Sequence, residues 1–439
     1  MMNMYKNNHY NNLGMKEMYS YLSSYLSQEE ISSLKEEMNK PYSYKGLAVN
    51  INRLPLELVK KEYEELESDD IDPIRLTYLE NTIYPSKNIY HEGGGYYILD
   101  PSSLEASLQL GINNKKLVLD LCAAPGGKTI AYAIRNKDSL IIANDISYKR
   151  ALELSKNVER LGLPNVIVTS LDPKVFLKYF ESSFDQIILD APCSGSGMFR
   201  KEKKMEEDWS IEKVNSLLPI QDNLLETSYK LLKKGGELLY ITCSFLKEED
   251  EDRIENLINN HIDINVVSPR IFRNEYKEGS IHNCIHLLPS LFKGEGHFFT
   301  LLRKDGEITD NMDNLTKSKF DNKLNLYIVN YQNEEYGINY FSPLFLKLNP
   351  LRIGIKLTNH SEYSKINEDH SLSHYSSFNK LEVSKEDAIL YLSGNELKGY
   401  DSYNNGTYII SYNSLGLGYG VKKGDRIKNI YPKGLRKNL

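Results

Sequence analysis

The feature that most constrains the fold of this chain is a regular alternation of strand-like and helix-like segments across residues 106–304. The apolar, strand-like runs lie at 117–121, 139–143, 165–169, 185–190, 236–242 and 297–303. Between them come the helix-like segments "GGKTIAYAIRNK", "YKRALELSKNVERLG", "PKVFLKYF" and "VNSLLPIQDNLLETSYKLLKKGG", the last of which ends in glycines suited to stop a helix. This alternation predicts an α/β fold with a doubly wound, Rossmann-like sheet.

The regions on either side of this segment have different patterns. Residues 1–105 are predicted to be mostly helices and loops, with helical spacing in "MKEMYSYLSSYLSQEEISSLKEEM" and a further candidate in "DPIRLTYLEN". Residues 305–380 are rich in Asn, Ser, Lys and Asp, which is typical of a linker or a small intermediate module. Residues 381–439 contain short strand-like runs with Gly and Asn turns, such as "GTYIISYN", and are predicted to form a small β-rich domain.

Composition excludes several classes of protein. The 439-residue chain has a net charge of −6 and four cysteines. No run of about 18 apolar residues is present, so no membrane-spanning helix is expected. The polar N-terminus lacks the apolar core of a signal peptide, so secretion is not expected. The cysteines lie far apart without a C-x-x-C pair, so zinc-site spacing is absent and no metal site is predicted. A reduced, cytoplasmic setting fits this cysteine usage.

A loop after the first predicted strand, "VLDLCAAPGGKTI" at 118–130, comes within one residue of the phosphate loop G-x-x-x-x-G-K-[ST]. Gly126 and Gly127 allow a tight turn and the close approach of a ligand. Cys122 stands where the first glycine of a phosphate loop would be, and Pro125 removes one of the backbone amides that would wrap a phosphate. The loop therefore fits a ligand at a strand-to-helix turn better than it fits a nucleoside triphosphate.

An acid follows each of the next two predicted strands. Asp145 lies 25 residues after Asp120, where nucleotide-binding folds bind ribose hydroxyls. The alternative is that Asp145 caps the following helix, but the glycine-containing first turn favours ribose binding. Asp172 could accept a hydrogen bond from an adenine amino group, and a helix cap before Pro173 is an equal alternative.

Two further motifs place cysteines at the ends of predicted strands. "FDQIILDAPCSGSGMFRK" contains Asp190 and then Cys193, and its "IILD" would also suit the acidic strand of a nucleoside triphosphatase. "ELLYITCSFLKEEDED" places Cys243 after an apolar strand. A cysteine beside a strand is usually part of the core. Three of the four cysteines fall at the carboxyl ends of predicted strands, where ligands bind in such sheets, so we interpret them as site residues.

The C-terminal segment "KKGDRIKNIYPKGLRKNL", residues 422–439, holds seven Lys and Arg residues against one Asp. A solvated basic tail is the plain alternative. The interleaved Tyr431, Pro432 and Leu435 favour an ordered surface that faces RNA. The residues predicted to contact RNA are Lys422, Lys423, Arg426, Lys428, Lys433 and Arg436.

Taken together, "CAAPGGKT", "DAPCSGSGMFRK" and "YITCSFLKEEDED" resemble the motifs of the Sun/nucleolar-protein family of RNA 5-methylcytosine methyltransferases. The flanking "YHEGGGYYILDPSSL", "EEDWSIEKV" and "GEGHFFTLLRK" resemble its RsmF-like bacterial branch, and "KNIYPKGLR" resembles the PUA-like domain of that branch. The resemblance covers residues 45–304 and 381–439 and is thin over 305–380. It implies an N-terminal RNA-binding region (1–105), a class I methyltransferase domain (106–304) and a PUA-like RNA-binding domain (381–439).

The resemblance also implies roles for individual residues. The loop would hold S-adenosylmethionine, and the implied cofactor-binding residues are Cys122, Ala123, Ala124, Pro125, Gly126, Gly127, Lys128, Asp145, Asp172 and Asp190. Cys243 would attack carbon-6 of cytosine, Asp190 would bond the ring near nitrogen-3, and Cys193 would assist release of the methylated RNA. Asp250 stands where the family commonly has Asn.

By the same resemblance the substrate is ribosomal RNA of the small subunit, bound by a monomer that turns the target base out of its stack. Two alternatives stay open. A P-loop NTPase is favoured by the near-Walker spacing and "IILD", and a catalytically silent RNA-binding protein is favoured by the basic C-terminus. The presence of both Cys193 and Cys243 weighs against the silent protein.

Overall fold

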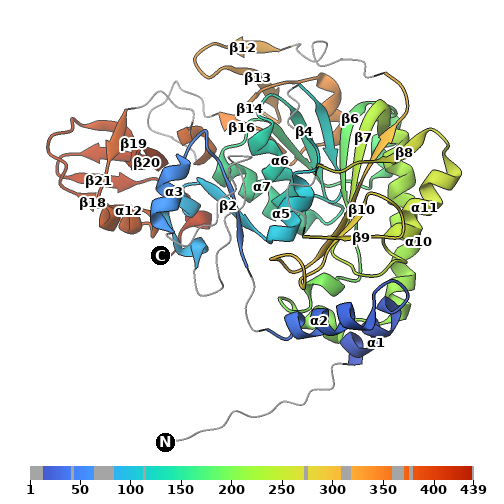
Figure 1. The fold of residues 1–439 in the computed structure, drawn as a ribbon. Helices are drawn as coiled ribbons and strands as arrows, with labels where there is room; N and C mark the ends of the chain where they lie inside the picture. Colours follow the sequence, from blue (N-terminus) through green and yellow to red (C-terminus); the bar gives the residue numbers. More distant parts are fainter. Residues whose placement is uncertain are drawn as a thin grey trace, which may run out of the picture.

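The structure is a computed structural model. It describes residues 13–40, 44–63, 84–111, 115–270, 275–307, 318–357, 370–374 and 379–437, so the predicted helical segment "DPIRLTYLEN" lies outside the described residues. Figure 1 shows a large central sheet with helices on both faces, a small sheet above it, and a C-terminal sheet (red) to one side. Among the described residues, no helix is both long enough and apolar enough to cross a membrane.

The large sheet has ten strands and contains every strand predicted over 117–303, which confirms the α/β prediction. Its parallel centre, in spatial order, is β5 (Val166–Thr169), β4 (Leu140–Asn144), β3 (Leu117–Asp120), β6 (Phe184–Asp190) and β7 (Leu232–Thr242). The antiparallel strands beyond β7 are β11 (His297–Lys304), β10 (Cys284–Leu287), β9 (Lys277–Glu278) and β8 (Ile264–Val267). The strand order reverses between β4 and β6, and such a reversal is where ligands bind in open α/β sheets.

Helices cover both faces of this sheet because successive strand residues point in opposite directions. Val118 packs into the cluster formed with α5 (Pro101–Ser107), α6 (Gly127–Arg135) and α7 (Tyr148–Leu161). Leu119 packs into the opposite cluster, whose helices are α8 (Lys174–Phe180), α10 (Ile211–Leu231) and α11 (Glu251–Asn260). The two buried layers fix the ends of the parallel strands in space.

The end of α10 differs from the sequence prediction. The helix ends at Leu231, and the glycines expected to stop it lie inside β7, so that prediction is wrong. Gly235 has φ 73°, and the pairing of β6 with β7 shifts register between Phe184 and Gln186. The positive φ that glycine permits is therefore used for an irregularity in the strand rather than for a helix cap.

The first helical segment packs against the segments that follow β6 and β7, below the large sheet in Figure 1. It forms α1 (Leu13–Leu22) and α2 (Gln28–Met38), and α2 begins at a capping box in which Ser27 and Glu30 bond each other's backbone. Buried side chains of these helices form one cluster with Phe199, Trp209 and Phe245. Phe199 and Phe245 belong to the segments that follow the two site cysteines, so α1 and α2 support both segments.

The rest of the N-terminal region packs against the C-terminal unit. The N-terminal elements are β1 (Gly46–Val49), α3 (Leu56–Glu62), η1 (Pro85–Lys87), α4 (Ile89–Glu92) and β2 (Tyr96–Leu99). The C-terminal sheet runs in the order β17 (Lys380–Glu382), β19 (Gly406–Tyr412), β20 (Leu415–Lys423), β21 (Arg426–Asn429) and β18 (Leu397–Lys398), with α12 (Lys385–Leu392) beside it. Val49, Tyr96, Leu417 and Ile427 share one buried cluster, and Figure 1 shows α3 and β2 beside this sheet. We call this cluster the shared core.

Residues 318–357 form a small β module. Its strands are β12 (Lys319–Asp321), β13 (Leu326–Tyr331), β14 (Glu334–Ile338) and β16 (Ile355–Leu357), followed in the chain by η5 (His370–His374). Val329, Ile338 and Phe345 of η4 (Pro343–Leu348) belong to the same apolar cluster as α8 and α10. The short strand β15 (Arg352–Ile353) pairs with β5 and extends the large sheet. The described part of this segment is therefore docked on the large sheet.

Candidate active site

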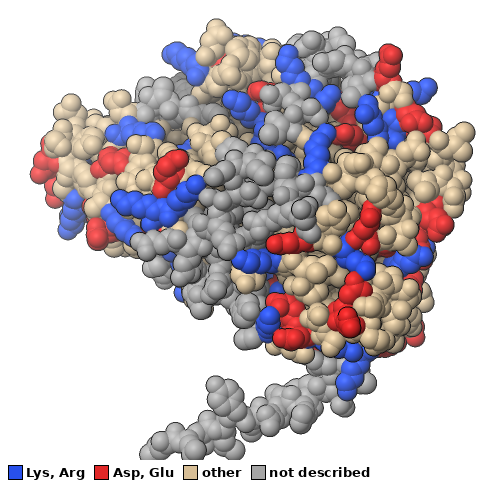
Figure 2. Space-filling model, viewed as in Figure 1, with Lys and Arg blue, Asp and Glu red and all other residues tan. Residues whose placement is uncertain are grey.

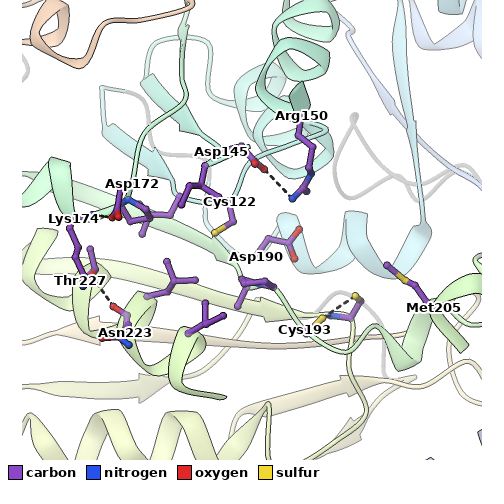
Figure 3. A pocket seen from close by; sticks show the side chains of 18 residues that line it. Cys122, Asp145, Arg150, Asp172, Lys174, Asp190, Cys193, Met205, Asn223 and Thr227 are labelled. Atoms are coloured by element: carbon purple, nitrogen blue, oxygen red, sulfur yellow. Dashed lines mark hydrogen bonds and ion pairs between the residues drawn. The ribbon is translucent and has the colours of Figure 1, made fainter. Parts of the chain in front are cut away.

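A cavity of about 640 Å³ opens at the carboxyl ends of the parallel strands. Six residues singled out from the sequence line it, namely Cys122, Asp145, Asp172, Asp190, Cys193 and Cys243. They lie at or just after the carboxyl ends of five different strands. Figure 3 labels all of them except Cys243 and shows their side chains around the cavity. The motifs meet because the carboxyl ends of parallel strands share one edge of the sheet.

The two cysteines that follow β6 and β7 face each other. The distance between Cys193 Sγ and Cys243 Sγ is 3.1 Å, and the backbone N–H of Cys243 donates to Cys193 Sγ at 3.2 Å. The contact with the Cys243 sulfur, together with burial, raises the pKa of Cys193 well above its usual range. This direction favours the thiol form of Cys193, and either sulfur can donate the hydrogen bond that joins the two.

Asp190 is paired with the lysine of the glycine-containing loop. Lys128 Nζ lies 2.7 Å from Asp190 Oδ2, and the Lys128 side chain is almost completely buried. Burial lowers the pKa of Lys128, but the attraction of Asp190 outweighs it and raises the pKa overall. In a phosphate loop the lysine reaches toward phosphates. Here it bonds a carboxylate of the cavity instead, which disfavours the P-loop alternative.

The loop from Cys122 to Lys128 turns behind the cavity. Only Cys122 of this loop has a side chain that lines the cavity; Ala123, Ala124, Pro125, Gly126, Gly127 and Lys128 do not. Gly126 has φ 116°, and a Cβ at this position would lie 2.8 Å from Leu154 Cδ1, so a side chain is excluded on both counts. Arg150 Nη2 donates to the carbonyl of Ala124. The loop thus sets the shape of the cavity floor through its backbone.

Each of the two acids beyond the loop bonds a nearby backbone N–H and also lines the cavity. Asp145 Oδ1 accepts from the N–H of Ser147 at 2.9 Å, which is a turn bond, because Ser147 itself is the N-cap of α7. Its buried Oδ2 accepts no hydrogen bond, although Arg150 Nη1 lies 3.3 Å away. Asp172 Oδ1 accepts from the N–H of Lys174 at 2.9 Å, and the side chain also lines the cavity. An unused carboxylate oxygen at the cavity wall suits the hydroxyls of a ribose.

Sequence reasoning missed the apolar wall of the cavity. Ile146 is 69 % exposed, Ile220 47 % and Met205 38 %, because they face the open cavity. The only feature of the sequence that could have placed Ile146 in this wall is its position directly after Asp145. Ile220 lies on α10 and Met205 on α9 (Lys203–Glu207), outside the motifs. Apolar side chains beside polar ones are typical of sites for nucleosides and flat bases.

The basic residues near the C-terminus are not equivalent. Lys423, Arg426, Lys428 and Lys433 are exposed, and Arg436 is half-buried and donates to the carbonyl of Tyr431. Lys422 is buried, and its ammonium donates to the carbonyl of Gly424, which disfavours its predicted contact with RNA. On the face drawn in Figure 2, acidic and basic side chains are mixed, and no single sign dominates.

The fold and the cavity define a class. A Rossmann-like sheet with a glycine-containing first turn and an acid after the second strand binds nucleosides, and S-adenosylmethionine-dependent methyltransferases share this architecture with dinucleotide-binding proteins. The family described as 16S rRNA methyltransferase RsmB/F matches residues 107–303, and the family described as methyltransferase RsmF PUA domain matches residues 378–437. Residues 107–303 are thus similar to an RsmB/F methyltransferase, and the C-terminal unit matches a PUA domain.

Similar proteins agree with this assignment over most of the chain. The ribosomal RNA small subunit methyltransferase F of Shewanella woodyi is 27% identical over 462 residues, covering 93% of this chain and 96% of that protein. The protein of the same name from Aeromonas salmonicida is 28% identical, covering 82% and 83%. A solved methyltransferase homologue from Pyrococcus horikoshii is 26% identical with a TM-score of 0.56, covering 66% of this chain and 93% of that one.

S-adenosylmethionine is the cofactor of this class, and the residues present fit it. The Oδ2 of Asp145, which accepts no hydrogen bond within the protein and is ion-paired with Arg150, can accept from ribose hydroxyls, and Ile146 offers an apolar surface beside it. Asp172 stands further along the same wall. When bound, the cofactor supplies an electrophilic methyl group at the edge of the sheet where Asp190 and the cysteines lie.

Proposed function

We propose that this chain methylates carbon-5 of cytosine in small-subunit ribosomal RNA, acting as a monomer in the cytoplasm. The observation that carries the proposal is the pair of thiols, Cys193 and Cys243, which lie 3.1 Å apart in the cavity that also holds the Asp190 carboxylate. A methyl transfer to oxygen or nitrogen needs no such pair. The names of the relatives, each a small-subunit ribosomal RNA methyltransferase, support the substrate class.

The chemistry explains why a thiol is needed. Carbon-5 of cytosine is a poor nucleophile, but addition of a thiolate to carbon-6 makes carbon-5 enamine-like. Cys243 would form this bond. The addition places negative charge on the ring near nitrogen-3. Asp190 would bond the ring there, and the buried Lys128 ammonium, 2.7 Å from its carboxylate, would supply the positive charge that offsets the negative charge.

Cys193 would act on the second half of the reaction. After carbon-5 is methylated, a base removes its proton, the carbon-5 to carbon-6 double bond re-forms and the Cys243 sulfur leaves. The raised pKa of Cys193 keeps a thiol proton beside that departing sulfur. A hydrogen bond from Cys193 stabilises the leaving thiolate and so favours release of the RNA.

The remaining regions would bind the RNA. A cytosine must leave its stack to reach a thiol inside a cavity. We assign catalysis to residues 106–304 and RNA binding to residues 1–105 and the PUA domain at 381–439. The exposed Lys423, Arg426 and Lys428 would contact phosphates.

Methylation of defined substrates tests the proposal. Purified protein is incubated with labelled S-adenosylmethionine and either assembled small subunits or naked ribosomal RNA, both from cells that lack this gene. Bisulfite sequencing should then find cytosines that become protected only when the wild-type protein is present. Label on another base, or on cytosine without bisulfite protection, would contradict carbon-5 methylation. A purified protein that binds the cofactor but labels neither RNA would contradict the substrate.

A further inference from the structure

One buried carboxylate beside the cavity has no part in the mechanism above. Glu249 lies in the acidic run after Cys243, yet its side chain is wholly buried. Among the residues that the structure describes, no lysine, arginine or histidine forms an ion pair with it. A buried carboxylate is expensive to keep without a counter-charge, so its hydrogen bonds must offset the lost hydration.

Four donors converge on this carboxylate. Glu249 Oε1 accepts from the backbone N–H of Ser194 at 2.8 Å and from Gln221 Nε2 at 3.1 Å. Glu249 Oε2 accepts from the hydroxyls of Ser194 and Ser244, each at 2.6 Å. Hydrogen bonds to an ionised group are short and roughly twice as strong as neutral ones.

The donors belong to the two cysteine segments. Ser194 directly follows Cys193, and Ser244 directly follows Cys243. Gln221, on α10, also donates to the carbonyl of Pro192 at 3.0 Å, so it bonds the first segment as well as the carboxylate. One side chain thus holds the segment after β6 and the segment after β7 at a fixed separation.

We propose that Glu249 is a positioning residue that sets the distance between the Cys193 and Cys243 thiols. It touches neither substrate nor cofactor, since it acts through the serines beside the cysteines. The consequence for catalysis rests on the proposed function, because only a cysteine mechanism needs the two thiols face to face. The positioning itself can be measured without RNA.

The measurement is the rate at which the two thiols form a disulfide in the presence of diamide. The two thiols give up two electrons and two protons as the sulfur–sulfur bond forms, and the nitrogen–nitrogen double bond of diamide takes them up as a hydrazine. Peptide mapping identifies the Cys193–Cys243 product. The rate at which one thiol attacks the other within the same molecule depends on how the two thiols are held.

Variants at Glu249 should separate positioning from folding. Glu249→Ala should slow disulfide formation by about tenfold, because the bonds through its carboxylate are lost and the two segments are then joined mainly by the bonds from the Gly197 N–H to the Cys243 carbonyl and from the Phe245 N–H to Ser196 Oγ. Glu249→Gln should have a smaller effect, since its oxygen still accepts from the Ser194 N–H and its amide can donate to the serine hydroxyls. The matched control is Glu248→Ala, which alters the neighbouring, half-buried glutamate whose carboxylate accepts none of these bonds.

Three outcomes decide the proposal. A folded Glu249→Ala protein that oxidises at the wild-type rate would overturn it. If Glu249→Ala does not fold, Ser244→Ala removes one of the four bonds, and a wild-type rate in that variant would overturn it equally. A slowed oxidation in the Glu249 variants, with cofactor binding retained and Glu248→Ala unchanged, supports it. If the wild-type protein methylates no cytosine, the proposed function fails while the oxidation rates still decide the positioning.

Discussion

Two interior regions of this molecule are held together in different ways. At the carboxyl edge of the large sheet, polar bonds hold the functional groups, as with Lys128 against Asp190 and the serines on Glu249. In the shared core, apolar side chains from segments hundreds of residues apart pack together, as with Val49 and Leu417. Substitutions of the reacting groups at the carboxyl edge should lower activity with little effect on the free energy of unfolding. Substitutions in the shared core should lower the free energy of unfolding with little effect on activity.

The largest effect is expected at the sheet edge. Cys243→Ala removes the proposed nucleophile and should lower methylation by roughly three orders of magnitude or more. The side chain is small and lies at the cavity, so the melting temperature should change little. Methyl transfer, calorimetry of cofactor binding and thermal unfolding measure the three quantities. A variant that retains more than a few percent of the activity would remove Cys243 from the nucleophile role.

The second cysteine should give a qualitatively different defect. Cys193→Ala leaves the nucleophile in place but removes the thiol beside it, so methyl transfer should proceed once and release should fail. A covalent protein–RNA complex should then survive denaturing electrophoresis, and it should be absent from the Cys193→Ala, Cys243→Ala double variant. Normal turnover without such a complex would mean that Cys193 has no part in release.

The shared core should respond through stability instead. Leu417 is fully buried there, and Leu417→Ala should lower the free energy of unfolding by about 2 to 5 kcal/mol. The same substitution at Leu390, which is 45 % exposed in the same unit, should cost less than about 0.5 kcal/mol. Denaturant unfolding gives both values. Equal effects of the two substitutions would contradict the packing seen here. Cofactor affinity at low temperature should be unchanged in both.

Acid should also lower the free energy of unfolding, because the buried His91, beside the shared core, is held neutral in the folded state. Burial, with the Arg160 charge beside it, lowers the pKa of His91 to about 4, although Glu92 lies 2.9 Å away and opposes the shift. The folded state therefore binds fewer protons than the unfolded state between pH 4 and the ordinary histidine value of about 6.5. Stability contributed by neutral His91 is present above pH 6.5 and is lost as the pH falls toward 4.

The expected loss is on the order of 3 kcal/mol over that window. Denaturant unfolding from pH 7 to pH 4 measures it in the wild type and in His91→Gln, whose side chain does not titrate. The pH profile of His91→Gln should be flatter by that amount. His282→Gln is the control, since His282 is largely exposed and should leave the profile unchanged. Parallel profiles for wild type and His91→Gln would contradict the lowered pKa.

The same contrast explains how much could be predicted from sequence. The parallel strands and the site acids lie in short motifs, and parallel strands bring their carboxyl ends to one edge, so Asp145, Asp190 and Cys243 could be placed together in advance. Glu249 could not, because an acidic run after a strand is typical of a solvated helix start. Its burial depends on serines and a glutamine from other segments.

The C-terminal unit could be predicted only in part. Its strands have turn signals, but the apolar partners of Leu417 lie in the N-terminal region, and no local pattern links the two. A domain with its own core could be removed without harm to the rest of the chain. The shared core argues against such independence for residues 381–439, because Leu417 and Val49 lie in one buried cluster. The burial of Lys422 could not be predicted for a related reason, since it depends on alternation at the end of β20, where Val421 is half-buried, Lys422 buried and Lys423 exposed.

The smallest effect is expected from the exposed basic residues of the PUA domain. Reversing Lys423, Arg426 and Lys428 to glutamate should weaken RNA binding roughly tenfold at moderate salt, since three phosphate contacts are lost. The slope of log affinity against log salt should fall by about 2, at about 0.7 for each phosphate contact. Because these side chains are exposed, the melting temperature should stay close to that of the wild type.

A matched triple reversal tests whether position or net charge matters. Lys234, Lys319 and Lys323 are also exposed but lie outside the PUA domain, so their reversal changes the net charge by the same amount. Steering by overall charge would lower RNA affinity equally in both triple variants. A local phosphate-binding surface would lower the affinity and the salt slope only when the PUA residues are reversed. Unchanged affinity in the PUA variant would mean that this end of the chain packs on the protein without contacting RNA.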